Sequence, residues 1–131
     1  MIINEYPPNY EEIKKVFDIE NENVIFTYGE NIYNPKKLEI HNHLLIHEYV
    51  HSKQQKETGI KDWWEKYLAD KIFRLEQETK AYQAQYRYAK EFLNDEGRKI
   101  FLDSIASDLS SKIYGNMISH SKAETLIRKK A

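Results

Sequence analysis

The chain has 131 residues and a mass of 15.7 kDa, the size of one domain with a core of its own. Its 20 Lys and Arg residues balance 21 Asp and Glu residues to a net charge of −1, so we expect no nucleic-acid partner. The absence of Cys excludes disulfides and thiolate metal sites, and it favours a reducing compartment.

No segment has the pattern of a membrane span or a signal peptide. The longest purely apolar runs are three residues, such as Leu44-Leu45-Ile46, far short of a transmembrane helix. The first five residues have neither a basic start nor an apolar stretch. We therefore expect a cytoplasmic protein with no membrane partner.

The first third of the chain holds all three Pro residues and is predicted to be the irregular part. Asn9 is expected to cap a short helix, with Glu12 as its capping-box partner. Val24–Tyr28 is rich in β-branched and aromatic residues and predicts a strand. Residues 29–30 suit a tight turn that returns the chain as a second strand over 31–33. The expected β element is a small hairpin.

The pattern is helical from about Leu38 onward. Gly59 is a typical helix C-terminal signal, and Asp62 is expected to cap the next helix. A helix unbroken from there to Leu93 would be about 50 Å long, too long for so small a domain. We therefore expect a break near residues 68–71. Two further helices are expected at about 98–112 and 121–130.

The segment from His47 to His51 reads H-E-x-x-H. On a helix these two His residues lie one turn apart and about 40° around the axis, so both imidazoles can reach one metal ion. Glu48 flanks them, where a general base for a metal-bound water belongs. An ordinary solvated helix with Ile46 and Val50 buried is the alternative. Those apolar residues share the side of the two His, however, and buried imidazoles need partners.

A catalytic zinc site needs a third protein ligand, which without Cys is a His or a carboxylate. His120 is a weak candidate between two helices. His43 lies one turn before His47, but three ligands along one straight helix span about 11 Å and cannot converge on one ion. We expect His43 at the rim of the site or supporting a ligand, and His41 on the surface.

The carboxylate candidates are Glu76 and Glu78 on the following helix. An apolar stripe through Leu75 and Tyr82 places both about 80° from its centre, on opposite sides. Periodicity alone therefore leaves both open, and one of the two must be an ordinary solvated glutamate.

The H-E-x-x-H segment, followed by Glu78-Thr79-Lys80-Ala81-Tyr82, resembles the gluzincin metallopeptidases. Residues 24–90 more narrowly resemble small phage- and prophage-encoded proteins of the minigluzincin type. The resemblance implies an α+β, mainly helical, zincin-like fold. It also implies Zn²⁺ held by His47, His51 and Glu78, with Glu48 as the catalytic residue, and so selects Glu78 over Glu76. In such enzymes an extended substrate pairs with a strand such as 24–28, and the alternative is a hairpin that only covers the helices.

Several residues are candidates for supporting roles. Gln54 and Gln55 lie one turn beyond His51 and could hydrogen-bond near the site. Tyr82 could fix Glu78 or pack in the core, and Tyr114 is a candidate for stabilising an oxyanion. The remaining aromatic cluster is expected to pack in the core, and it comprises Trp63, Trp64 and Tyr67.

We interpret residues 1–131 as a single zincin-like domain. It would consist of an N-terminal helix and hairpin (1–37), the metal-site helices (38–94) and C-terminal helices without an assigned role (95–131). The favoured function is a zinc metallopeptidase that hydrolyses a peptide or protein through a water activated by Glu48. The alternative is a latent or non-catalytic zinc-binding phage protein, with the segment after about Tyr114 over the metal. A third hypothesis is a helical interaction protein with an accidental motif.

Overall fold

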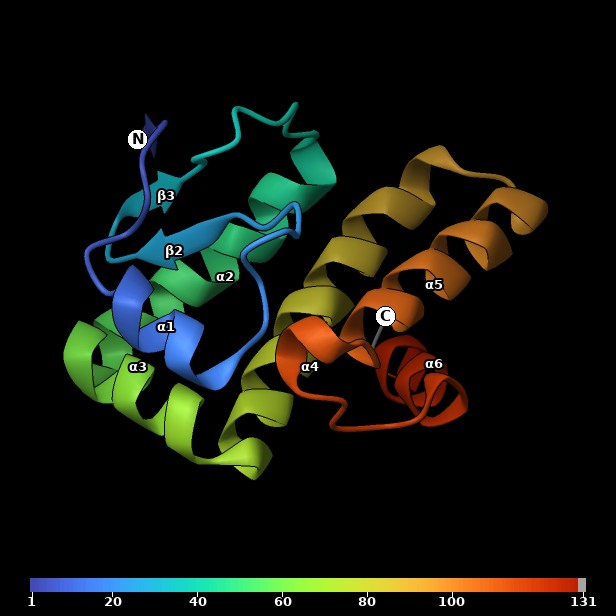
Figure 1. Ribbon diagram of the computed structural model, residues 1–131. Helices are drawn as coiled ribbons and strands as arrows, with labels where there is room; N and C mark the ends of the chain where they lie inside the picture. Colours follow the sequence, from blue (N-terminus) through green and yellow to red (C-terminus); the bar gives the residue numbers. More distant parts are fainter. Residues whose placement is uncertain (130–131) are drawn as a thin grey trace.

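The computed structural model describes residues 1–129 and is mainly helical, with a small sheet at the N-terminal end, as the sequence predicted (Figure 1). No helix within this range is both long and apolar enough to cross a membrane. The elements are β1 (Ile2–Ile3), α1 (Tyr10–Val16), β2 (Phe26–Tyr28), β3 (Asn31–Tyr33), α2 (Asn42–Thr58), α3 (Ile60–Ala69), α4 (Lys71–Ala89), η1 (Lys90–Phe92), α5 (Asp95–Leu109), η2 (Lys112–Tyr114) and α6 (His120–Lys129).

The sheet has three strands in the order β1-β3-β2, and it lies against α2 (Figure 1). β2 and β3 form the predicted antiparallel hairpin, with Thr27 opposite Ile32 and a positive φ of 65° at Gly29. β2 begins at Phe26, two residues later than predicted. β1 adds to β3 in parallel, which the sequence did not predict because two residues show no periodicity.

The junction between α2 and α3 differs in part from the prediction. α2 ends at Thr58, and Gly59 follows with a φ of 99°, a conformation that glycine adopts without strain. α3 then begins at once at Ile60, so Asp62 lies in its first turn instead of capping it. The expectation that Asp62 caps this helix was wrong because Gly59 ends one helix and starts the next.

The predicted break before α4 is present, and Asp70 marks it. Its carboxylate accepts from the backbone N–H groups of Ile72 (2.9 Å) and Phe73 (3.2 Å), which makes it the N-cap of α4. α5 similarly begins three residues earlier than predicted, because Asn94 accepts from the N–H of Gly97 at 2.8 Å.

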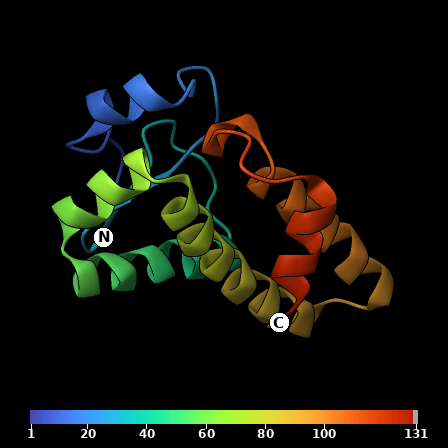
Figure 2. The same cartoon turned by 90° about the horizontal axis from the view of Figure 1, so that it is seen from below.

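Two cores lie on either side of α4. Figure 2 shows α1 and α3 on one side of this helix and α5 and α6 on the other. The N-terminal core joins α1, β2 and α3 and contains the predicted aromatic cluster; its buried members are Ile13, Phe17, Ile19, Phe26, Trp63, Trp64 and Tyr67. The C-terminal core joins α4, α5 and α6; its buried members are Tyr82, Tyr86, Leu102, Ile105, Ala106, Leu109, Ala123 and Ile127. Because α4 carries residues of both cores and packs against α2, its orientation is fixed on three sides.

Candidate metal centre

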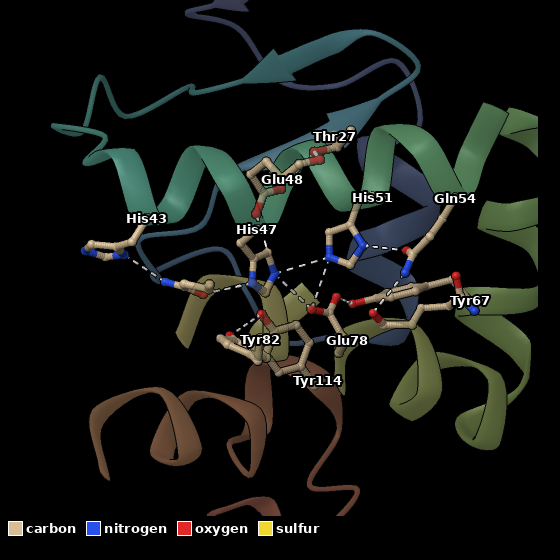
Figure 3. Close-up of polar contacts among 12 residues, drawn as sticks. Thr27, His43, His47, Glu48, His51, Gln54, Tyr67, Glu78, Tyr82 and Tyr114 are labelled. Atoms are coloured by element: carbon tan, nitrogen blue, oxygen red, sulfur yellow. Dashed lines mark hydrogen bonds and ion pairs between the residues drawn. The ribbon is translucent and has the colours of Figure 1, made fainter. Parts of the chain in front are cut away.

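Three buried side chains converge between α2 and α4 (Figure 3). Nε2 of His47 and Nε2 of His51 each lie 3.1 Å from the same Glu78 oxygen, Oε1, and 3.2 Å from one another. The three residues are only 2–4% exposed. Two imidazole nitrogens and a carboxylate oxygen around one point form a donor set that could hold a metal ion. We call these three residues the metal group.

Helix packing decides which glutamate joins the metal group. His47 and His51 lie one turn apart on α2, and α2 packs against α4 on the side of Glu78. Glu76 lies on the exposed side of α4, where its carboxylate is 3.6 Å from Lys80 Nζ. The structure thus brings Glu78, and not Glu76, to the two histidines.

Two glutamines contact the Nδ1 atoms of the two histidine rings, on the side away from Glu78. Nδ1 of His47 lies 2.9 Å from Gln85 Oε1, and Nδ1 of His51 lies 2.9 Å from Gln54 Oε1. If both Nε2 atoms face a metal, each Nδ1 carries the hydrogen and donates it to the amide oxygen. Gln54 was expected near the site, whereas Gln85 was missed. Its position two turns after Glu78, on the same face of α4, was the available signal.

The second oxygen of Glu78 is held by α3. The Tyr67 hydroxyl donates to Oε2 at 2.5 Å, so this carboxylate is fixed from both sides. Tyr82, the sequence candidate for that role, instead packs its ring against His47 and hydrogen-bonds the Tyr114 hydroxyl at 2.7 Å. With ten Tyr residues in the chain, no local pattern distinguished Tyr67.

Glu48 lies beside the metal group but is not part of it. Its Oε1 accepts from the Thr27 hydroxyl at 2.8 Å, and its Oε2 is 3.7 Å from His47 Nε2. Burial raises the pKa of Glu48, while the neighbouring His47 and His51 act in the opposite direction. A carboxyl with a raised pKa, next to a metal group, is suited to accept and release protons near neutral pH.

Without a metal, the Glu78 carboxylate favours the protonated form of His51. Burial alone would raise the pKa of Glu78, but His51 and the hydrogen bonds from both histidines lower it well below the usual range. Burial alone would lower the pKa of His51, yet the Glu78 carboxylate raises it to about 9. A bound cation would take the place of this proton, so we expect binding to release it.

A small cavity of about 60 Å³ adjoins the metal group. Apolar side chains from both ends of the chain form much of its wall, and they are Ile13, Phe17, Ile19, Val24, Ile25, Phe26 and Ile113. Pockets that enclose drug-sized ligands are about 300 Å³ or more, so this cavity has no room for a peptide. Residues 17–25 and 113–114 therefore cover the metal group.

The two covering segments are joined at the surface, where Lys112 Nζ lies 3.1 Å from Glu22 Oε1. Figures 1 and 2 both show the loop after α1 beside η2. Tyr114 lines the cavity, at the start of the segment that the hypothesis of latency placed over the metal. The residues that follow it pack away from the cavity, because α6 contributes Ala123 and Ile127 to the C-terminal core.

The edge of β2 that faces α2 is already hydrogen-bonded. The Thr27 carbonyl accepts from Gln55 Nε2 (2.8 Å) and Trp64 Nε1 (3.2 Å). The Gly29 N–H donates to Gln55 Oε1 at 2.7 Å, and its carbonyl accepts from the Ser52 hydroxyl at 2.8 Å. A substrate strand would pair with residues 27–29 on this edge only by displacing these groups.

The remaining histidines lie outside the metal group. His41 is exposed, as expected, and His120 begins α6, where its ring contacts Asp103 on α5. His43 adjoins Gln85, with its Nδ1 2.9 Å from Gln85 Nε2.

A scan against protein-family models, a search of curated proteins and a search of solved structures each find no match. The geometry of the metal group and Glu48 is therefore what indicates the function.

Proposed function

We propose that the protein is a zinc-dependent metallopeptidase with a zincin-like fold, in which His47, His51 and Glu78 hold Zn²⁺ and Glu48 is the catalytic base. The convergence of three buried ligand atoms, with a second carboxyl, that of Glu48, beside them, carries this proposal. Two imidazoles and one carboxylate are a donor set of catalytic zinc, which keeps a further position open for water and substrate.

Each side chain has a role in peptide hydrolysis. Zinc would polarise the scissile carbonyl and acidify a water molecule. Glu48 would take the proton of the attacking water and pass it to the leaving amine. The Thr27 hydroxyl occupies Oε1 of Glu48, which leaves Oε2 facing the metal group for this proton.

Tyr114 is the candidate donor to the oxyanion. It lines the same cavity as Glu48 and His47. Burial raises the pKa of Tyr114 well above its ordinary value, so its hydroxyl stays protonated and can donate.

The cavity wall indicates the kind of substrate. Its lining is apolar and aromatic, and the ionisable carboxyl and imidazole groups among the lining residues belong to the metal group and Glu48. We therefore expect a peptide or protein substrate with an apolar side chain next to the scissile bond. Such a substrate enters only when residues 17–25 and 113–114 move aside.

The deciding experiment combines zinc content by elemental mass spectrometry with cleavage of a peptide library rich in apolar residues. Glu48→Gln is expected to keep its zinc and to lose cleavage by about 10²–10⁴-fold, the usual contribution of a general base. Glu76→Gln, an exposed glutamate on α4, is the matched control and should retain both. Measurable cleavage that is equal in the wild type and in Glu48→Gln would contradict the proposed mechanism.

The small size of the cavity and the burial of the metal group favour a second candidate, a latent or non-catalytic zinc-binding phage protein. Lys112→Glu reverses one charge of the surface ion pair and should weaken the contact between the covering residues 17–25 and 113–114. Adding Glu22→Lys should restore the ion pair and the contact. Cleavage that appears with the single variant and disappears with the double variant would support latency. Zinc binding without cleavage in any variant would support a binding role.

A further inference from the structure

The two glutamines behind the metal group are anchored differently. Gln54 Nε2 donates to the backbone carbonyl of Gln77 at 3.2 Å, and because a carbonyl only accepts, the Gln54 oxygen is kept toward His51. Gln85 Nε2 instead lies 2.9 Å from His43 Nδ1. A ring nitrogen accepts in one tautomer and donates in the other. The orientation of the Gln85 amide therefore depends on His43.

An inverted Gln85 amide would oppose metal binding at His47. Its NH₂ group would then face His47 Nδ1, which would have to accept. The neutral ring would carry its hydrogen on Nε2, where Glu78 Oε1 at 3.1 Å could accept it. All these groups would be hydrogen-bonded, but a hydrogen would occupy the nitrogen that faces the metal. This state would compete with metal binding.

We propose that His43 is a positioning residue for metal binding. By accepting at Nδ1, it holds Gln85 in the orientation that keeps Nε2 of His47 open to the metal. This inference rests on the proposed function for the presence of the metal. Figure 3 shows His43, His47 and His51 in a row on α2, with His43 outermost. Its ring is half-buried and packs against His41 and, from α5, edge-on against Phe101.

The test measures Zn²⁺ affinity of the full chain by competition with a chromophoric chelator. His43→Leu removes the acceptor while keeping a side chain of similar size, and it is expected to weaken zinc binding at least about 10-fold, as loss of a ligand's support does. His43→Lys, which can only donate, should weaken it further. His41→Leu is the control, because it removes the ring that stacks on His43. Its zinc affinity should stay within about threefold of the wild type.

The same His43 substitution, made in a Gln85→Glu variant, distinguishes a role of His43 in orienting Gln85 from a general packing role. In Gln85→Glu, the carboxylate accepts from His47 through either oxygen, whatever residue stands at position 43. On this background His43→Leu should change zinc affinity by less than about threefold. A packing role for His43 would give the same loss on both backgrounds. Thermal unfolding of each metal-free variant shows that the fold is kept.

The outcomes distinguish this inference from the proposed function. A wild-type chain that binds no zinc would overturn the metal centre and the role of His43 with it. A wild type that binds zinc, together with a His43→Leu variant of equal affinity, would overturn only the role of His43. An equal loss on both backgrounds would do the same.

Discussion

Two groups in residues 1–129 each bring three potential ligand atoms within 4.8 Å of one another. The metal group is buried between α2 and α4. The other, Asp103, His120 and Glu124, joins α5 to α6 near the surface. In that surface group Nε2 of His120 faces Asp103 at 3.1 Å, while Nδ1 faces Glu124 at 3.9 Å.

The difference between the groups lies in what supports the ligand atoms. Both Nε2 atoms of the metal group point at one carboxylate oxygen, and their Nδ1 atoms are held by Gln85 and Gln54. In the surface group a single imidazole lies between two carboxylates, with Nε2 toward Asp103 and Nδ1 toward Glu124. Proximity of acidic and imidazole groups is therefore common to both, whereas burial and supporting hydrogen bonds distinguish the metal group.

Removing the Glu78 carboxylate from the metal group should have the largest effect. Glu78→Gln should reduce zinc from about one ion per chain to a small fraction, because a neutral amide replaces the only carboxylate of the group. Zinc at 100 times its dissociation constant stabilises a protein by about 2.7 kcal/mol, and this stabilisation should be lost as well. Elemental analysis and thermal unfolding with and without chelator measure both effects.

Glu76→Gln is the matched control, because the same substitution two residues away lies on the exposed side of α4. It should leave zinc content and chelator-sensitive stability as in the wild type. If Glu78→Gln retained its zinc while Glu76→Gln lost it, the assignment of the third ligand would be wrong.

The next effect concerns pH in the metal-free protein. The folded pKa of His51, about 9, lies above its ordinary value of 6.5, so its contribution to stability is complete below 6.5 and is lost as pH rises toward 9. The lowered pKa of Glu78 contributes stability above 4.5 that is lost as pH falls further. Urea unfolding with chelator should therefore show the unfolding free energy decreasing between pH 6.5 and 9.

The same titration distinguishes the metal group from the surface group. Glu78→Gln should flatten the pH dependence on both sides, whereas Glu124→Gln in the surface group should leave these two slopes in place. An unfolding free energy of the metal-free wild type that rises steadily from pH 6.5 to 9 would refute the coupling of His51 to Glu78.

The smallest effect is expected in the surface group. His120→Ala removes partly exposed ion pairs, which contribute at most about 1 kcal/mol to stability and less at high salt. Zinc content should not change. A loss of zinc in His120→Ala, with Glu78→Gln unaffected, would reverse the roles that we assign to the two groups.

Local sequence determined much of the metal group. The spacing of His47 and His51 places both imidazoles on one face of any α-helix that contains them, and Glu48 must then flank them. Gly59 and the turn at residue 29 were likewise predictable, because glycine adopts positive φ without strain. These features depend on the backbone within a few residues, so periodicity and residue type suffice.

The tertiary structure decided the rest. Glu76 and Glu78 are equivalent by periodicity. The resemblance favoured Glu78, and the packing of α2 on one side of α4 brings Glu78 to the two histidines. Tyr67 and Thr27 reach the site from α3 and β2 at positions that no local pattern marks. Gln85 reaches it from the far end of α4, and only its spacing of two turns from Glu78 marks it. Their roles arise from contacts between elements distant in sequence, because hydrogen-bond partners of buried polar groups are set by which helices and strands pack together.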